Sequence, residues 1–311
     1  DEVESLYREA RQTTALLDAL YGSAPIGLGF WDRDLRYVRV NEALARINEV
    51  PVKDHVGLTF ADVVPLLADV LEPLARGVLE TGEPVIARQI TTGTPENPEV
   101  PRYWVASYYP VNGRSGERIG VGAVVEEITD RRRAEQRSEL AHQVTRILVD
   151  AVSLEEAIPQ VLETICTSLS FEVACYWSTD PDAPRIIWSQ PDAHVDGFVA
   201  VTERASLSPT MLAGRVAATG SAEWLVDLEP ERFVRAPVAA AEGLRSGVAF
   251  PVLVEGEAAG VVEVFSGARR EVDDQLFASL EALGGQLGQF LRRKRAEEER
   301  VQILQREQEA R

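Results

Sequence analysis

The residue types that carry most catalytic and metal chemistry are scarce in this chain of 311 residues. It has three histidines and two cysteines, Cys166 and Cys175. The cysteines lie near an expected helix-to-strand transition, without a CxxC spacing and without a neighbouring histidine, so the pattern lacks the spacing of a zinc or redox site. We expect both thiols to be reduced and buried, and we expect no catalytic residue and no metal site.

His142 lies on an expected charged helix, which is where a phosphate-accepting histidine would lie. Such histidines are typically followed by an acidic residue that assists proton transfer, whereas Gln143 follows here. No glycine-rich phosphate loop ending in Lys-Ser or Lys-Thr follows either. We therefore interpret His142 as an exposed helix residue, and we expect no enzyme activity in this segment.

The charge balance excludes two classes of partner. Acidic residues outnumber basic ones by 50 to 32, which gives a formal charge of -18 that repels phosphate backbones and anionic lipids. No stretch approaches the roughly 20 apolar residues that span a bilayer, and no signal peptide pattern opens the chain. We expect a cytoplasmic protein with no nucleic acid or membrane partner. Asp1 at the start indicates a fragment of a longer protein.

The order of expected elements predicts two domains, as the length also suggests. Alternating apolar residues predict strands, and turn residues separate them. In the first half the strands are expected at residues 26–31, 35–40, 85–91, 102–111 and 118–128, with helices between 41 and 82. In the second half they are expected at residues 171–178, 185–189, 222–228, 247–254 and 258–265, with helices at 153–169, after Ser208-Pro209 and at 236–243. This is an α+β fold with two antiparallel sheets flanked by helices.

Three helical segments space their apolar residues by alternating steps of three and four, which is typical of a coiled coil. They are residues 1–21, 131–152 and the last forty residues of the chain. Because identical seams can meet across a two-fold axis, we expect a parallel homodimer, and the last seam points to an output domain further along the parent chain. The expected seam residues are Leu17, Leu20, Leu148, Leu283, Leu287, Phe290, Val301 and Leu304.

Three glycines interrupt the last helix, at Gly284, Gly285 and Gly288. Each costs roughly 1 kcal/mol relative to alanine in a helix interior, so something should offset the cost. We favour close packing of the helix on its own sheet. Close approach of two helices in a dimer, or a point where the helix bends, are the alternatives.

The segment at residues 127–135 reads E-I-T-D-R-R-R-A-E and follows the last expected strand of the first half. It resembles the D-I-T-E-R-K-R-A-E exit of PAS domains, with Glu127 in place of the aspartate. The expected hairpin at residues 30–37 and the helix start at Asn41 support the same resemblance over residues 22–130. The resemblance implies that four residues couple the sheet to the exit helix: Glu127, Thr129, Asp130 and Arg131.

The second half carries the segments G-V-A-F-P-V-L-V at residues 247–254 and L-G-G-Q-L-G-Q-F-L-R-R-K-R-A-E at residues 283–297. Both resemble GAF domains. The two resemblances imply an organisation that covers nearly the whole chain: a coiled-coil helix at 1–21, a PAS domain at 22–130, a linker helix at 131–152, a GAF domain at 153–290 and a signalling helix at 291–311.

Domains of these two kinds offer a pocket between sheet and helices. In the PAS segment, Trp104, Ala106 and Tyr108 share one strand face, and Gln89 on the neighbouring strand could add an amide. Gln89, Trp104 and Tyr108 are our candidates for a ligand pocket. The alternative is that the aromatic side chains simply fill the core, which such faces do more often.

In the GAF segment, Arg215, Trp224 and Asp227 fall around the middle helix and strand, where such families bind small molecules. They are the second set of pocket candidates. Solvated surface charge is the alternative, and it is the more common fate of such residues.

No cofactor is predicted. A flavin photoreceptor of the LOV type needs a reactive cysteine, and the PAS segment has none. Covalent bilin attachment normally uses a cysteine followed by histidine, which neither Cys166 nor Cys175 provides. Haem needs an axial ligand, whereas His55 precedes a turn and His194 lies in a polar loop. An unidentified small-molecule ligand remains open.

Tandems of PAS and GAF domains commonly precede histidine kinase cores. The resemblance therefore implies the sensory and dimerisation region of a bacterial two-component sensor, which relays a ligand- or partner-induced population shift through its helices. The alternatives are the regulatory region of a diguanylate cyclase or a PP2C-type phosphatase, and a ligand-free dimerisation scaffold.

Overall fold

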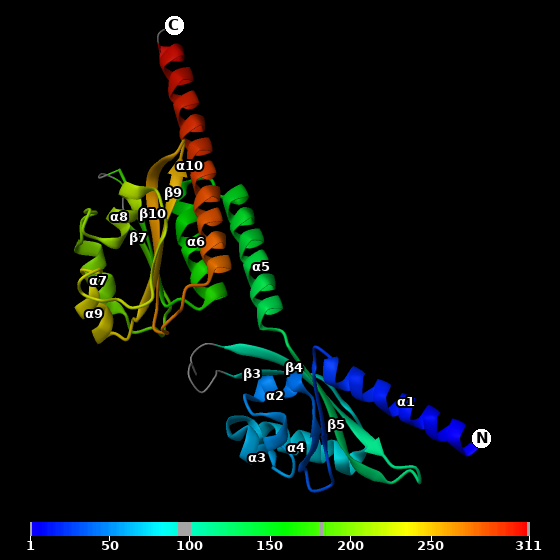
Figure 1. Cartoon of the computed structure of the whole chain (residues 1–311). Helices are drawn as coiled ribbons and strands as arrows, with labels where there is room; N and C mark the ends of the chain where they lie inside the picture. The colour runs from blue at the N-terminus through cyan, green and yellow to red at the C-terminus, as the bar shows by residue number, and fades with distance from the viewer. Residues whose placement is uncertain (1, 93–100, 181–182, 184, 310–311) are drawn as a thin grey trace. The chain divides into compact units, whose positions relative to one another are not determined.

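The computed structural model describes residues 2–92, 101–180, 183 and 185–309. It divides into two compact units, Asp1–Arg132 and Arg133–Arg311, each built on one five-stranded antiparallel sheet with helices against it (Figure 1). The predicted α+β fold with two antiparallel sheets is confirmed.

The first unit has the sheet order β2-β1-β5-β4-β3, and helices α2 to α4 cover one face of it (Figure 1). Its core combines aromatic side chains of the sheet with that of Phe60 in α3, which stacks on Trp31 at 4.9 Å between ring centroids. The elements are α1 (Glu2–Ser23), β1 (Gly27–Trp31), β2 (Tyr37–Val40), α2 (Glu42–Asn48), a 3-10 turn (Val52–Asp54), α3 (Phe60–Val63), α4 (Pro65–Thr81), β3 (Val85–Thr92), β4 (Arg102–Asn112), β5 (Arg118–Glu127) and α5 (Thr129–Asp150).

Local capping residues explain where the first helices begin. The Asn41 side chain accepts a hydrogen bond from the Leu44 amide and so caps α2, as predicted. Its own amide group donates to the carbonyls of Tyr21 and Ile26, which ties the end of α1 to the sheet. Thr59 and Asp62 form the expected capping box of α3.

The second unit has the sheet order β7-β6-β10-β9-β8, with α6 and α10 on one face and α7 to α9 on the other (Figure 1). The later part of α5 packs on the same side as α6 and α10. Both cysteines are free and buried, one in each of the two cores. The elements are α6 (Leu154–Leu169), β6 (Val173–Ser178), β7 (Ile186–Ser189), α7 (Asp196–Arg204), α8 (Leu212–Thr219), β8 (Glu223–Leu225), α9 (Ala236–Ala241), β9 (Ser246–Val254), β10 (Glu257–Ser266) and α10 (Asp274–Glu309).

Half of the expected dimer seam lies inside the second unit. Leu148, Leu283, Leu287 and Phe290 are at most 6% exposed, because they pack against the sheet and the neighbouring helices of their own chain. A helix that lies on a sheet buries one stripe of residues with the same spacing of three and four as a coiled coil. These four residues are therefore unavailable to a second copy, which corrects this part of the predicted seam.

The glycines of α10 divide into two kinds. A Cβ atom at Gly284 would collide with the carbonyl oxygen of Pro251, and one at Gly288 with that of Leu253, because α10 lies directly on β9 at these points. A Cβ at Gly285 would meet nothing within 4 Å. Close packing of the helix on its own sheet, the favoured interpretation, is correct for Gly284 and Gly288.

Two local expectations in the second unit differ from the structure. Helix α8 begins at Leu212 rather than directly after Ser208-Pro209, and the expected strand at residues 222–228 is only Glu223–Leu225. Helix α7 was not expected, because its apolar residues do not form a long periodic run. Prediction from periodicity is weakest for short elements whose boundaries depend on tertiary packing.

Candidate functional site

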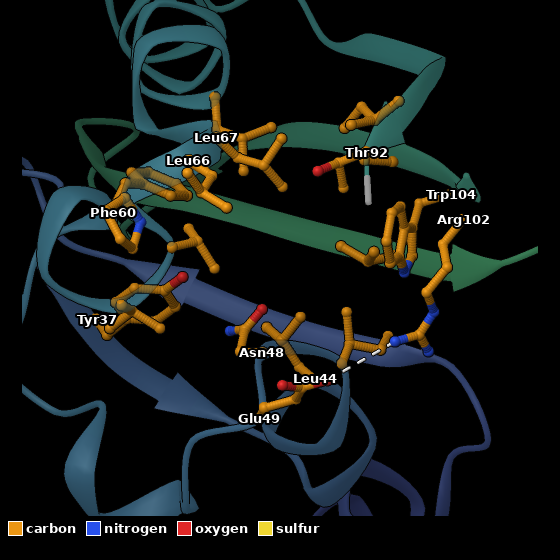
Figure 2. A pocket seen from close by; sticks show the side chains of 18 of the residues that line it. Tyr37, Leu44, Asn48, Glu49, Phe60, Leu66, Leu67, Thr92, Arg102 and Trp104 are labelled. Carbon is orange, nitrogen blue, oxygen red and sulfur yellow. Dashed lines mark ion pairs between the residues drawn. The ribbon is translucent and has the colours of Figure 1, made fainter. Parts of the chain in front are cut away.

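A cavity of about 390 Å³ lies between the sheet of the first unit and its helices α2, α3 and α4 (Figure 2). This volume is within the range of small-molecule pockets, roughly 300–1,000 Å³. The walls are mostly apolar and aromatic, and polar side chains lie among them and at the mouth. The lining includes Trp31, Tyr37, Leu44, Asn48, Glu49, Phe60, Leu67, Leu71, Ile90, Thr92, Arg102, Trp104, Ala106 and Tyr108.

Two of the three residues expected in this pocket, Trp104 and Tyr108, line it. Trp104, Ala106 and Tyr108 share the inner face of β4 and are at most 7% exposed. Gln89 does not belong to the pocket: it is exposed and pairs with Val105 on the outer face of the sheet, whereas Ile90 pairs with Trp104. The register of β3 shifts between Val85 and Arg88, so counting along the strand from its start misplaces the inward positions.

Two buried donors on side chains of the pocket wall lack a partner. The indole N–H groups of Trp31 and Trp104 make no hydrogen bond to any described residue. The Trp31 nitrogen lies near the Tyr37 hydroxyl, without the geometry of a hydrogen bond. Burial raises the pKa of Tyr37 and of Tyr108 well above the ordinary value for tyrosine. The neighbouring phenol of Tyr108 raises the pKa of Tyr37 further. Both phenols are therefore protonated at neutral pH.

His55 lies behind the pocket and is fully engaged by the protein. Its Nδ1 is 3.0 Å from the carbonyl oxygen of Pro51, and its Nε2 is 3.0 Å from the side-chain nitrogen of Asn48. Since a carbonyl only accepts and an amide nitrogen only donates, Nδ1 carries the proton and Nε2 accepts. The imidazole ring packs edge-on against Tyr37.

Arg102 stands at the mouth of the pocket, at the same end as Trp104 (Figure 2). Its guanidinium group lies 5.4 Å from the centroid of the Trp104 ring. Nε and Nη2 donate to the two oxygens of Glu127 over 2.9 and 2.8 Å, while Nη1 is 3.7 Å from Glu49. The hydrogen bonds to Glu127 are the main cause of a raised pKa for Arg102. This two-point contact is directional as well as charged.

Glu127 joins the mouth of the pocket to the first turn of α5. One of its oxygens accepts a hydrogen bond from the Thr129 hydroxyl over 2.9 Å, and that hydroxyl accepts one from the Tyr103 amide over 3.0 Å. The carbonyl of Tyr103 in turn accepts from the Ile128 amide over 2.8 Å. A contact chain therefore runs from a pocket residue, Arg102, to the start of the exit helix.

Only two of the four expected coupling residues belong to this chain of contacts. Glu127 and Thr129 bond each other and strand β4, whereas Asp130 is exposed. Arg131 is also exposed, with its guanidinium 3.9 Å from Glu126. The motif in the sequence did not indicate Arg102, because its side chain meets Glu127 only through the register at which β4 and β5 pair.

Two family models match the chain, one described as the PAS fold at residues 21–133 and one as the GAF domain at residues 151–292. The chain is a PAS domain followed by a GAF domain. This tandem is the one that the sequence resemblance predicted.

The solved structures that this chain matches share little sequence with it. VqmA of Vibrio cholerae is 19% identical over 37% of this chain and 52% of its own, with a TM-score of 0.34. The GAF domain of a phosphoenolpyruvate-protein phosphotransferase from Coxiella burnetii is 18% identical over 53% of this chain and 97% of its own, with a TM-score of 0.44. Free methionine-R-sulfoxide reductase of Neisseria meningitidis is 17% identical over 53% and 93%, with a TM-score of 0.42.

This chain spans about half the length of two of the VqmA chains that it matches. No curated protein matches it.

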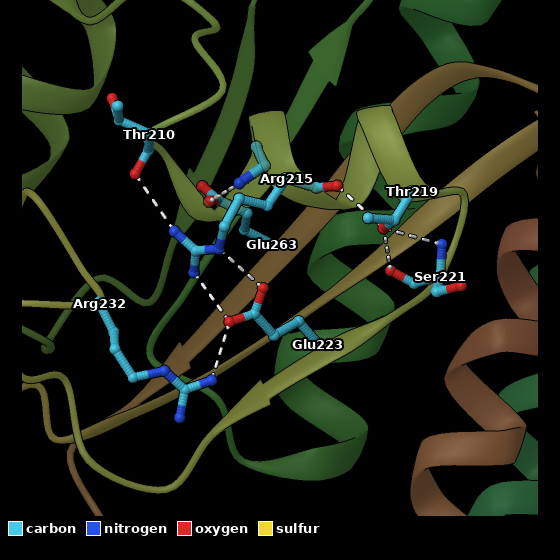
Figure 3. Close-up of polar contacts among 8 residues, drawn as sticks. Thr210, Arg215, Thr219, Ser221, Glu223, Arg232 and Glu263 are labelled. Atoms are coloured by element: carbon cyan, nitrogen blue, oxygen red, sulfur yellow. Dashed lines mark hydrogen bonds and ion pairs between the residues drawn. The ribbon is translucent and has the colours of Figure 1, made fainter.

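The three residues expected to form a pocket in the GAF domain do not come together. Arg215 in α8 binds Glu223 through two nitrogens, over 3.0 and 2.8 Å (Figure 3). Trp224 projects to the opposite face of the sheet, where it packs with Phe277 of α10. Asp227 forms an exposed ion pair with an arginine in the loop between β10 and α10. Consecutive strand residues point to opposite faces, which separates Glu223 from Trp224.

The GAF domain instead contains a buried ion pair that was not predicted from the sequence. Arg235 is 4% exposed and Glu263 is fully buried, and their side chains approach to 2.5 Å. Glu263 also accepts from the Trp177 indole over 2.8 Å and from the Ala213 amide over 3.0 Å. Arg235 donates further to Thr202 over 2.8 Å. An acidic residue between the apolar residues of β10 was the available indication.

Aromatic rings surround this pair between the sheet and α7 to α9. The Arg235 guanidinium lies 5.0 Å from the ring of Phe198, 4.9 Å from that of Phe233 and 5.3 Å from that of Phe265. These contacts fill the interior on that side of the GAF sheet. In the described residues, no three His, Cys, Asp or Glu side chains gather in a group that could hold a metal ion.

Proposed function

We propose that this chain is the sensory region of a larger signalling protein, in which a small molecule in the PAS pocket alters the attachment of α5 to the PAS sheet. The observation that carries the proposal is the position of Arg102. This residue lines the pocket, stacks near Trp104 and holds Glu127, which in turn holds Thr129 at the start of α5.

The mechanism is a shift between two populations of the exit junction. A ligand that repositions Trp104 would also move the Arg102 side chain beside it, and the two-point bond to Glu127 cannot follow a displaced guanidinium without loss of geometry. The ligand then favours the junction arrangement in which it makes better contacts. The buried pair of Arg235 and Glu263, packed between the GAF sheet and α7 to α9, supports a structural and relay role for that domain.

Filling the pocket should abolish ligand binding. Ala106→Leu adds three carbon atoms at a fully buried position of the pocket wall, whereas Val105→Leu adds one carbon on the outer face of the same strand. We expect native mass spectrometry of the purified protein to show a bound small molecule in the wild type and the Val105→Leu control. Its amount in Ala106→Leu should fall at least about tenfold, because overpacking excludes it.

An empty wild-type protein would instead favour the ligand-free scaffold. Equal occupancy in Ala106→Leu and in Val105→Leu would place the ligand elsewhere. Either result contradicts sensing through this pocket.

For the parent protein we propose a cytoplasmic histidine kinase of a two-component system, because tandem PAS and GAF domains commonly precede such kinases. A diguanylate cyclase or a PP2C-type phosphatase is the second candidate for the output domain. Helix α10 extends well beyond the GAF sheet, as a helix leading to an output domain would. Across the described ranges, no helix is apolar enough over its length to cross a bilayer.

We further propose a parallel homodimer, formed through apolar residues that the chain itself leaves uncovered. Leu17 and Leu20 of α1 are 60% and 59% exposed, and Val301 of α10 is 52% exposed. Val149 in the last turn of α5 and Val152 just after that helix are also exposed. The side chain of Leu304, the last expected seam residue, lies outside the described residues. Identical exposed stripes on two copies can cover each other across a two-fold axis.

Disulfide crosslinking tests this arrangement. Leu17→Cys and Val301→Cys should each give a symmetric dimer under mild oxidation, because in a parallel pair each residue meets its own copy. The native cysteines should not interfere, since burial raises the pKa of both thiols and so suppresses their thiolate forms. Val56→Cys, 60% exposed but outside the proposed seam, is the control. Failure of both seam variants to crosslink would exclude the parallel dimer.

A further inference from the structure

The chemistry inside the PAS pocket identifies the class of ligand, given the sensory function proposed above. Trp31 and Trp104 are 2% and 7% exposed, and among the described residues neither indole N–H has a partner. Buried donors are almost always satisfied in folded proteins, so each unpaired one requires an explanation. A ligand that supplies a hydrogen-bond acceptor would explain both.

The charges at the mouth disfavour an anionic ligand. Arg102 contributes one positive charge there, whereas Glu49 and Glu127 contribute two negative charges within ion-pair distance of it. Two of the guanidinium nitrogens already donate to Glu127. An entering carboxylate or phosphate would therefore lack a free cation and would be repelled by two carboxylates.

The interior also offers little to a cationic ligand. The phenols of Tyr37 and Tyr108 remain protonated, so they supply no negative charge. Glu49, more than half exposed, is the carboxylate of the described lining, and it lies at the rim. Burial of an ammonium group without a paired carboxylate is strongly unfavourable.

We infer that the PAS pocket binds a neutral, largely apolar ring compound with at least one hydrogen-bond acceptor, such as a carbonyl oxygen or a ring nitrogen, that accepts from the Trp104 indole N–H. The aromatic walls formed by Trp31, Phe60 and Trp104 suit a flat ring, and the 390 Å³ cavity has room for a two-ring body. An acceptor at a second point of the ligand would satisfy Trp31.

Four probes that share a naphthalene ring system separate the contribution of the hydrogen-bond acceptor from that of charge. 2-Acetylnaphthalene carries a carbonyl acceptor, and 2-isopropenylnaphthalene replaces that oxygen with a CH₂ group of similar shape. 2-Naphthoate carries a negative charge, and 2-naphthylmethylammonium a positive one. Equilibrium dialysis against the full chain gives the four dissociation constants. We expect the ketone to bind about five- to tenfold more tightly than the hydrocarbon and more tightly than either ion.

Trp104→Phe identifies the donor, because it keeps an aromatic ring and removes the indole N–H. In this variant the ketone should lose its advantage over the hydrocarbon, while the affinity for the hydrocarbon changes by less than about threefold. The unchanged hydrocarbon affinity would show that the variant is folded and its pocket intact. Trp31→Phe should leave most of the ketone preference in place.

The inference is overturned if the hydrocarbon or either ion binds as well as the ketone, if the preference survives Trp104→Phe, or if no probe binds. The proposed sensory function fails separately. It fails if the probes bind in the expected order but hydrogen exchange at residues 129–133 of α5 is the same with and without the ketone.

Discussion

Replacing Glu263 with glutamine should lower the free energy of unfolding of the GAF domain by about 3–5 kcal/mol. The substitution keeps the shape of the side chain but leaves the Arg235 guanidinium buried without a counter-charge, among the rings of Phe198, Phe233 and Phe265. Hydrogen exchange of the β10 amides, measured at increasing urea concentrations, reports the stability of this domain without interference from the PAS domain.

The matched control is Asp227→Asn, which breaks an ion pair whose side chains are about half exposed. Surface pairs contribute about 0–1 kcal/mol, so this variant should be close to the wild type. The double variant Arg235→Met/Glu263→Leu should recover much of the loss, since two apolar residues leave no buried charge unpaired. A loss below about 1 kcal/mol for Glu263→Gln would contradict a structural role for the buried pair.

Gly288→Ala should destabilise the contact between α10 and β9 by about 1–3 kcal/mol or more, although alanine is the better helix former. The new methyl group would collide with the backbone carbonyl of Leu253, which cannot rotate away as a side chain could. Gly285→Ala, three positions earlier on an open side of the same helix, should instead stabilise the protein by about 0.5–1 kcal/mol.

The two substitutions should change the stability of the protein in opposite directions, so each variant is a control for the other. Thermal unfolding of both proteins under one buffer condition provides the measurement. If Gly288→Ala were as stable as Gly285→Ala, α10 could not lie on β9 as the structure shows. In the proposed function, α10 is the helix that leads from the GAF sheet to the output domain.

Features determined by neighbouring residues could be predicted from the sequence. Asn41 and Thr59 mark helix starts, because a capping side chain bonds an amide two or three positions ahead of it. The inward face of β4 followed from simple alternation, which placed Trp104, Ala106 and Tyr108 together. The exit segment was recognisable as a motif, and Glu127 and Thr129 do join the sheet to α5.

Features that depend on distant residues could not be predicted in this way. Arg235 and Glu263 meet only after β10 and the loop before α9 are packed together. Arg102 and Glu127 meet through the register of two strands. The spacing of Leu283, Leu287 and Phe290 is the same for a helix on a sheet and for a coiled coil, so periodicity alone cannot distinguish a core from a dimer interface.

Hydrogen exchange at the start of α5 tests the central claim, that occupancy of the PAS pocket changes the exit junction. The exchange rates of the amides at residues 129–133 would be compared with and without saturating 2-acetylnaphthalene, in the wild type and in Glu127→Gln. Glu127 does not line the pocket, so its replacement should leave ligand affinity within about threefold while weakening the bond to Arg102. We predict a change of at least about threefold in the wild type that is lost in Glu127→Gln. Unchanged exchange in the ligand-bound wild type, or the same change in both proteins, would contradict the account.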